Sequence, residues 1–85
     1  MDELIKRLEY GAEVIVSFYT GEMEISQKDD VVIAVDWDDS SLEIDLGQSQ
    51  QHIEIEKSKV KNVTEYGNEY TVEFLSGSKI IFSFC

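Results

Sequence analysis

Strict alternation of apolar and polar residues is the feature that most constrains the fold of this chain. From residue 13 onward, segments such as EVIVSFY (13–19) and LEIDL (42–46) place apolar residues at every second position. Successive side chains of a β-strand point to opposite faces, so this period predicts strands with one buried face. Turn residues recur at intervals of about ten residues, which favours a meander of short antiparallel strands.

The pattern assigns most of the chain to strands. The segments expected as strands are 13–19, a short MEIS strand at 23–26 before polar residues 27–30, then 31–38, 42–46, 52–56 and three more within 59–85. In the segment 31–38, the alternation assigns Val31, Ile33, Val35 and Trp37 to the buried face. Residues 38–41 are expected to form a turn between two strands of a hairpin, and residues 47–51 a loop.

A helix is expected before the first strand. Residues 2–10 place Leu4, Ile5 and Leu8 on one face, and Gly11 is positioned to end the helix as its C′ residue. The predicted fold class is therefore α+β and mostly β. It consists of a short N-terminal helix followed by an antiparallel meander sheet, or small partly closed barrel, of about 6–7 strands in a single domain, residues 1–85.

The charge of the chain is strongly unbalanced. Eighteen acidic residues oppose seven basic ones, which gives a formal net charge of −11. The hydrophobic content of 42 % nevertheless predicts a folded domain rather than a disordered acidic chain. Such charge repels phosphates and anionic lipids, so neither direct nucleic-acid binding nor membrane binding is expected. No apolar run is long enough to span a bilayer, and the expected localisation is cytoplasmic.

Enzyme chemistry finds little support in the sequence. The single histidine, His52, is expected to point outward, and the five glycines are scattered one per turn rather than gathered in a phosphate-binding loop. Residues 36–47 begin like a calcium-binding loop, but Ser41 stands where the loop glycine is needed and Gly47 where the closing glutamate is needed. We therefore expect no enzyme, no cofactor and no metal site. The one cysteine, Cys85, cannot form an intramolecular disulfide.

A short basic segment interrupts the acidic sequence. In KSKVK (57–61), Lys57, Lys59 and Lys61 alternate and are expected on one face of a strand. Lysines placed in this way are typical of an edge strand protected against sheet-to-sheet aggregation.

The acidic residues themselves form rows on the predicted strands. Residues i and i+2 lie about 6.6 to 6.8 Å apart on one strand face. Such spacing would make rows of Asp36 with Asp38, Glu43 with Asp45, and Glu54 with Glu56. Evenly spaced negative charge resembles a phosphate backbone and would attract a basic nucleic-acid channel. The predicted partner-binding residues are Asp36, Asp38, Asp39, Glu43, Asp45, Glu54 and Glu56.

The first 46 residues also carry a family resemblance. DELIKRLEYGAEVIVSFYTG, followed by VVIAVDWDDSSLEIDL, resembles the opening of small acidic phage-encoded anti-CRISPR proteins. The resemblance implies an inhibitor of an RNA-guided nuclease that occupies the PAM-reading site with acidic residues in place of DNA. The residues in that contact role would be Asp36, Asp38, Asp39, Glu43 and Asp45. The inhibitor most similar in pattern continues with helices, whereas residues 52–84 here are predicted as strands.

Two functions from different classes follow. The first is an acidic interaction protein that inhibits a nucleic-acid-binding protein, such as a CRISPR nuclease, by presenting a DNA-like carboxylate surface in the host-cell cytoplasm. The second is a small structural or assembly module in which sheet edges pair with a second copy as a homodimer, while the acidic surface serves solubility. Concentration-dependent sedimentation distinguishes the two.

Overall fold

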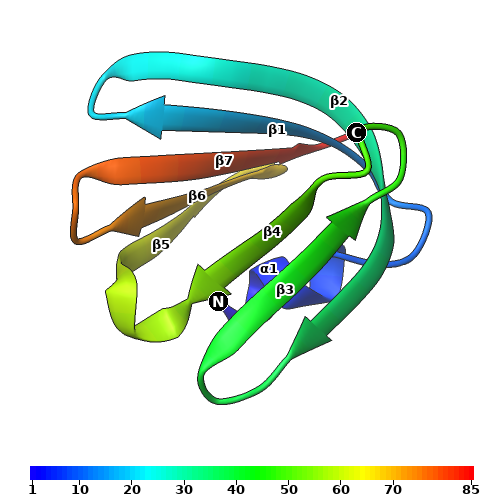
Figure 1. Cartoon of the computed structure of the whole chain (residues 1–85), viewed down its shortest axis with the longest axis horizontal. Helices are drawn as coiled ribbons and strands as arrows, with labels where there is room; N and C mark the ends of the chain where they lie inside the picture. Colours follow the sequence, from blue (N-terminus) through cyan, green and yellow to red (C-terminus); the bar gives the residue numbers. More distant parts are fainter.

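A computed structural model describes the whole chain, residues 1–85, as a short helix and one seven-stranded antiparallel sheet. The strand order is β4-β3-β2-β1-β7-β6-β5, so β4 and β5 form the two edges of the sheet (Figure 1). The elements are α1 (Asp2–Arg7), β1 (Glu13–Thr20), β2 (Met23–Trp37), β3 (Ser41–Leu46), β4 (His52–Glu56), the 3-10 turn η1 (Lys57–Lys59), β5 (Val60–Tyr66), β6 (Glu69–Phe74) and β7 (Ser78–Phe84). The predicted fold, mostly β with a short N-terminal helix, is confirmed.

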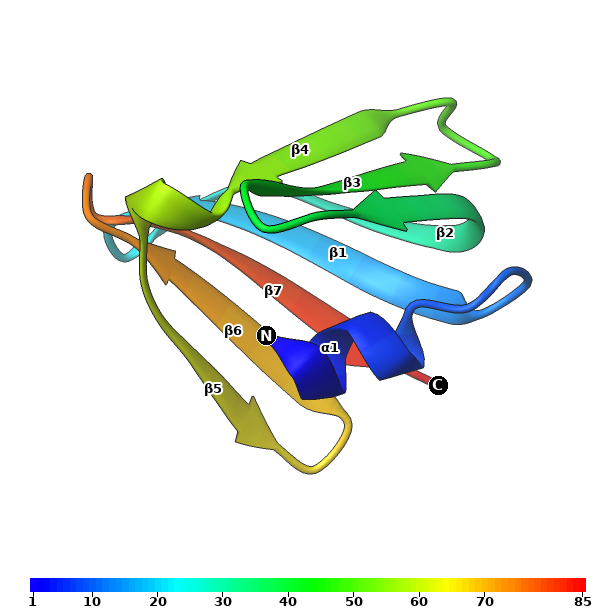
Figure 2. The same cartoon turned by 90° about the horizontal axis from the view of Figure 1, so that it is seen from below.

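The sheet curls strongly without closing into a barrel. Figures 1 and 2 show β3 and β4 on one side of the curl, β5 and β6 on the other, and α1 against the concave side. Strand β2 joins the two parts of the curl, because its first half pairs with β1 and its second half pairs with β3. Both edge strands consequently keep one side without a neighbouring strand.

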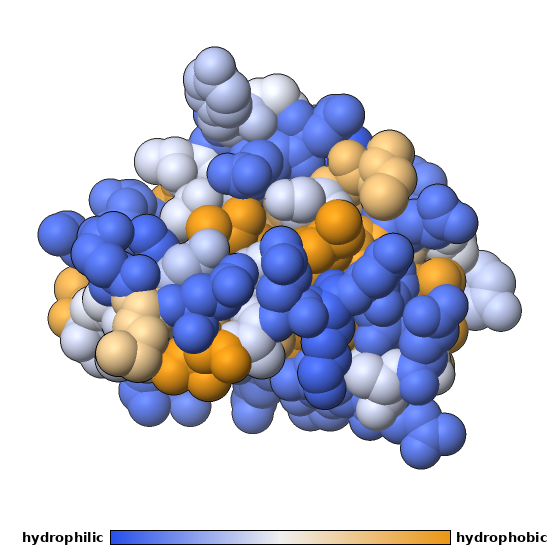
Figure 3. Space-filling view, turned by 90° about the horizontal axis from the view of Figure 1, so that it is seen from above, coloured by the Kyte–Doolittle hydropathy of each residue, from blue (hydrophilic) through white to orange (hydrophobic).

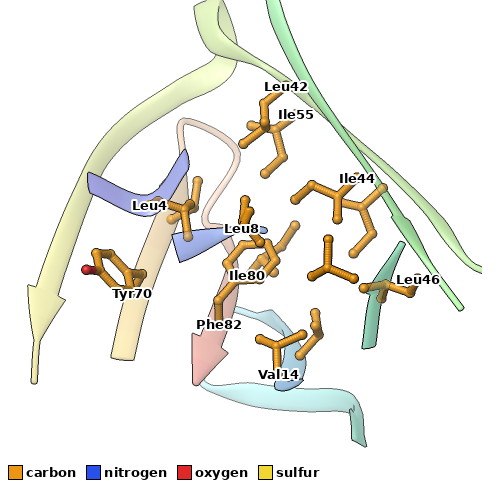
Figure 4. Close-up of a cluster of buried hydrophobic side chains, with 14 of the residues drawn as sticks. Leu4, Leu8, Val14, Leu42, Ile44, Leu46, Ile55, Tyr70, Ile80 and Phe82 are labelled. Atoms are coloured by element: carbon orange, nitrogen blue, oxygen red, sulfur yellow. The ribbon is translucent and has the colours of Figure 1, made fainter. Parts of the chain in front are cut away.

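The hydrophobic core fills the concave side of the sheet. One cluster contains 15 buried hydrophobic residues, among them Leu4 and Leu8 of α1. In Figure 4 these two leucines lie between Tyr70 and Phe82 of the C-terminal strands and Ile44 of β3. The short helix is therefore stabilised by the apolar surface that it covers, since six residues are too few for a stable isolated helix.

Most of the expected buried faces are confirmed. Alternation in β3, β4 and β7 buries every second side chain, as the sequence pattern indicates. The buried apolar residues at alternate positions of the strands are Val14, Val16, Leu42, Ile44, Leu46, Ile53, Ile55, Tyr70, Val72, Ile80, Phe82 and Phe84.

Strand β2 differs from the prediction in length. Polar residues 27–30 continue the strand instead of interrupting it, so β2 is 15 residues long. These residues pair with residues 14–17 of β1, and the backbone ladder does not require apolar side chains. The prediction of a separate short strand at 23–26 is therefore wrong.

Strand β2 also differs from the prediction in the faces of its side chains. Val32 is fully buried and Ile33 is 46 % exposed, the reverse of the expected assignment. A register shift against β3 between Val32 and Ala34 changes the alternation. From Val35 onward the expected side of the sheet is correct, but Trp37, which was expected to be buried, is 54 % exposed at the end of the strand. A β-bulge adds one residue to the strand, so a single period of two cannot describe both halves.

The helix is shorter than expected. It ends at Arg7 with Leu8 as its C-cap residue, rather than at residue 10. Gly11 is consequently not the C′ residue; with φ of +87° it forms the turn before β1, where its N–H donates to the carbonyl oxygen of Val32 at 2.8 Å. No helix in the chain has the length and apolar character of a membrane span.

The basic segment does not form one face of a strand. Lys57 and Lys59 belong to the 3-10 turn η1, and Lys61 alone lies on the edge strand β5. At Lys61 the register against β6 shifts, between Val60 and Asn62. The predicted alternation of three lysines on a strand is wrong, while the expected edge position of this region is correct for Lys61.

Candidate functional site

Three predicted partner-binding residues form one row across three strands. Asp36 of β2 lies opposite Glu43 of β3, and Glu43 lies opposite Glu54 of β4. All three side chains are on the convex face, because the residues beside them, Leu42 and Ile55, are buried in the core. Directly opposite side chains on a sheet have Cβ atoms about 4.5 to 5.5 Å apart. The register therefore brings together carboxylates that are far apart in the sequence.

Within this row, Glu43 and Glu54 are the more closely spaced pair. The N–H of Leu46 donates to the carbonyl oxygen of Gln51 at 2.9 Å, near one end of the ladder between β3 and β4. Because such ladders alternate, Glu43 and Glu54 form a pair without mutual hydrogen bonds, the type with the closer side chains. Neither Asp36 nor Glu54 takes part in an ion pair. The row, which we call the acidic row, is Asp36, Glu43 and Glu54.

His52 lies between two neighbouring carboxylates of the convex face. Its Nδ1 lies 2.6 Å from Oδ1 of Asp45, and its Nε2 lies 3.2 Å from Oε1 of Glu43. The hydrogen bond with Asp45 is the main reason why the pKa of His52 is raised above its ordinary value of 6.5. Protonation of His52 therefore reduces the negative charge of this surface.

A shallow hollow of about 200 Å³ lies beside His52 on the convex face. It is lined by Ala34, Val35, Asp36, Glu43, Asp45 and His52. Although acidic side chains and an imidazole meet here, no group of three or more histidine, cysteine, aspartate or glutamate side chains is placed to hold a metal ion. The hollow is lined mainly by three carboxylates and one imidazole.

Asp38 does not belong to a row. Strand β2 ends at Trp37, and the Asp38 carboxylate accepts hydrogen bonds from the backbone N–H groups of Ser40 (2.7 Å) and Ser41 (2.9 Å). These bonds lower the pKa of Asp38. The predicted row of Asp36 with Asp38 along one strand is therefore wrong, and Asp38 serves the turn between β2 and β3.

The other two predicted residues lie at the margin of this surface. Asp39 is exposed in the same turn as Asp38. Glu56, at the end of β4, lies 3.5 Å from Nζ of Lys59, so part of its charge is compensated. Among the predicted partner-binding residues, Asp36, Asp38, Asp39 and Glu54 take part in no ion pair, and of these Asp36 and Glu54 lie in the acidic row.

A buried carboxylate fixes the loop that leads to His52. Asp30 is only 2 % exposed and accepts hydrogen bonds from the backbone N–H groups of Val31, Gln48 and Ser49 at 2.8 to 3.1 Å. Burial alone would raise the pKa of Asp30, but the bonds from Ser49, Val31 and Gln48 outweigh it and hold the pKa at about 2. The anchored loop sets the start of β4 and thereby the position of His52.

The contacts of His52 and Asp30 were not predicted from the sequence. Asp45 and His52 stand on either side of the loop 47–51, four residues before and three residues after its central residue Ser49, and this near symmetry is the signal that could have suggested their pairing. Asp30 gives no such signal, because its partners are backbone groups 18 and 19 residues later in the chain. No protein-family model, curated protein or solved structure matches this chain.

Proposed function

We propose that this chain is an acidic interaction protein that inhibits a nucleic-acid-binding protein by presenting a DNA-like carboxylate surface. The observation that carries the proposal is the acidic row of Asp36, Glu43 and Glu54, which crosses three strands of a stiff sheet with no cation opposite its two ends. Like charges directly opposite each other on a sheet destabilise it. A basic partner would relieve that repulsion.

The chemistry of the surface indicates the kind of partner. Nucleic-acid-binding proteins present clusters of Lys and Arg that neutralise successive phosphates. A surface with closely spaced carboxylates can compete for those side chains, and a net charge of −11 steers it toward the same channel. The target class that fits best is a protein with a basic channel, such as a CRISPR nuclease in the host cytoplasm.

The proposal is tested by competition with DNA. A guide-loaded CRISPR nuclease of type II, with fluorescent target DNA, is titrated with the wild-type chain and with D36N/E43Q/E54Q. The matched control is E9Q/E22Q/D29N, which removes the same charge from exposed residues outside the row. Neutralising the row should weaken inhibition at least roughly tenfold, about 1.4 kcal/mol.

The dependence on ionic strength tests whether the acidic row acts through its charge. The loss of inhibition in D36N/E43Q/E54Q should be large at low ionic strength and shrink at high ionic strength, where the wild-type contacts are already screened. Equal inhibition by the row variant and the control would contradict the proposal. A chain that retains no nuclease and no other DNA-binding protein at low salt would contradict it as well.

A self-associating module is the alternative function, and one observation favours it. The first half of β2 has no strand on its outer side, and it carries Met23 (70 % exposed) and Ile25 (62 % exposed). Figure 3, seen from above the orientation of Figure 1, shows apolar areas between the predominantly hydrophilic side chains of one face. Sedimentation of wild type and M23S/I25T over a range of concentrations tests this function, which requires a dimer that the variant loses.

A further inference from the structure

We propose that the free edge of β4 binds an extended basic strand of the partner, which continues the sheet by one strand. The inference rests on the proposed function and specifies how the partner is held. It starts from the backbone of β4 rather than from its charge, because an edge strand presents unpaired N–H and C=O groups. Addition of a strand to such an edge is a general mode of peptide recognition.

The hydrogen bonds between β3 and β4 show which groups are free. The N–H of Lys57 donates to the carbonyl oxygen of Ser40, and the N–H of Leu46 donates to that of Gln51, both at 2.9 Å. Between these ends the ladder alternates, so Ile53 and Ile55 bond to β3. The N–H and C=O groups of His52 and Glu54 therefore point toward the empty edge, as does the N–H of Glu56, whose carbonyl begins the 3-10 turn η1.

The other unpaired segments carry features that oppose strand addition. On β5, the register shifts at Lys61, and a bulge together with a lysine is a common protection of an edge. On the first half of β2, the pairing with β1 shifts near Ile25, so that segment is irregular too. Strand β4 pairs with β3 in one unbroken register and contains neither proline nor lysine. Of these segments, β4 is the most regular template.

Charge complementarity identifies the occupant as a basic strand. A residue opposite Glu54 on an added strand would exchange backbone hydrogen bonds with Glu54. Its side chain would lie beside that of Glu54, in line with the acidic row. A lysine or arginine there meets a carboxylate that has no ion pair within the chain. A second copy fits less well, since antiparallel pairing centred on Glu54 would set two Glu54 side chains opposite each other.

The neighbours of β4 define the pattern of the partner strand. Glu56 and Glu54 favour two basic residues at alternate positions, whereas His52, already bonded to Asp45 and Glu43, favours a small neutral residue. The intervening residues would lie on the concave side, next to Ile53 and Ile55, and should be apolar. The expected partner segment thus alternates basic and apolar residues.

Synthetic peptides test the inference with the intact chain. The probe is a capped, fluorescently labelled peptide of the sequence Val-Lys-Val-Lys-Val-Thr-Val, measured by anisotropy. In the bound strand the N–H groups of the lysines face β4, and those of the valines face away. N-methylation of both lysines should weaken binding about tenfold or more, because each lost backbone bond costs roughly 1 kcal/mol. N-methylation of the two central valines should leave affinity within about twofold, and equal affinity of the two methylated peptides would overturn the inference.

A pair of protein variants tests the edge from the other side. Glu54→Thr and Glu54→Pro remove the same charge, but only proline removes the N–H that faces the edge. Proline is tolerated at such positions, because the bonds of β4 to β3 come from Ile53 and Ile55. Glu54→Pro should bind the peptide about fivefold more weakly than Glu54→Thr, because it lacks one backbone hydrogen bond. If Glu54→Pro fails to fold, the methylated peptides decide the question alone.

The outcomes separate this inference from the proposed function. If the position of the methyl groups is irrelevant while D36N/E43Q/E54Q still loses nuclease inhibition, strand addition is overturned and the proposed function stands. If methyl position decides peptide affinity but the row variant inhibits the nuclease as well as wild type does, edge recognition is supported and the proposed function fails. A wild-type dimer that Glu54→Pro abolishes, with no peptide bound, would identify a second copy as the occupant and overturn the inference.

Discussion

The carboxylate of Asp30 accepts a hydrogen bond from the backbone N–H of Gln48 at 2.8 Å, which connects the middle of β2 to the loop between β3 and β4. The same carboxylate also binds the N–H groups of Val31 and Ser49. Three backbone donors on one buried carboxylate outweigh the cost of burying its charge. The one buried carboxylate of the chain is thus structural, whereas the acidic side chains of the convex face are partly or fully exposed to solvent.

Replacement of this carboxylate by an amide should destabilise the fold. In Asp30→Asn the side-chain NH₂ group would face a backbone donor, and at least one buried N–H would lose its partner. We expect a loss of about 1 to 3 kcal/mol in the free energy of unfolding, measured by chemical denaturation. The matched control, Asp29→Asn, changes an exposed neighbour and should shift stability by less than about 0.5 kcal/mol. Equal losses in the two variants would contradict the structural role of Asp30.

The same contact gives a pH dependence with a definite sign. The folded pKa of about 2 is below the ordinary value of 3.8, so the stabilising contribution is present above 3.8 and is lost as the pH falls toward 2. As the pH falls from 3.8 toward 2, the free energy of unfolding of the wild type should therefore decrease more steeply than that of Asp30→Asn. Equal pH dependence of the free energy of unfolding in the two proteins would contradict the lowered pKa of Asp30.

His52 gives a pH dependence of stability with the opposite sign. Its pKa is raised above 6.5 by Asp45 and Glu43, so its ion pairs stabilise the fold fully below 6.5 and lose their effect as the pH rises through the folded pKa. An NMR titration of the imidazole should show that Asp45→Asn returns the pKa toward 6.5. The control Asp36→Asn, at a carboxylate without a bond to His52, should change it less. An unchanged pKa in Asp45→Asn would disprove this contact.

Gly47 is required by its contact with Ile33. A Cβ atom at residue 47 would lie 2.8 Å from Cγ2 of Ile33, a branched side chain with little freedom to move away. Gly47→Ala should lower stability by about 1 to 3 kcal/mol. The double variant Gly47→Ala/Ile33→Ala should recover most of that loss, and a double-mutant cycle measures the coupling. Additive losses would show that the two residues do not interact.

The fold was largely predictable because local alternation determines burial in most strands. In β3 and β4 the residues Leu42, Ile44, Ile53 and Ile55 follow a period of two, and they are buried as expected. In β2 the pattern fails at Ile33, because a bulge is a property of the pairing of two strands and does not show in the sequence of one. Residues 27–30 fail for a related reason: their strand conformation is imposed by β1.

The candidate surface was predictable in composition but not in arrangement. The outward direction of Glu43, Asp45 and Glu54 follows from alternation alone. Their grouping depends on the register, which places Glu43 between Asp36 and Glu54 and brings His52 against Asp45. The expected rows along single strands exist on β3, as Glu43 with Asp45, and on β4, as Glu54 with Glu56. The row across three strands was not expected, because a strand pattern cannot give the register of three strands.

The acidic row should reduce the stability of the chain, and this can be measured without a partner. Asp36 and Glu54 each lie opposite Glu43 and have no ion pair, so D36N/E54Q removes two like-charge contacts and leaves the bond of Glu43 to His52 intact. Each such contact costs about 0.2 to 1 kcal/mol. The free energy of unfolding of the variant should therefore exceed that of wild type by about 1 kcal/mol in total at low salt, measured by chemical denaturation.

The control E22Q/D29N removes equal charge at exposed residues away from the row, and its free energy of unfolding should rise less. At high ionic strength the two variants should approach each other, because exposed charges are screened within about 10 Å at 0.1 M salt. A gain in D36N/E54Q no larger than that of the control would show that the row stores no repulsion for a partner to relieve.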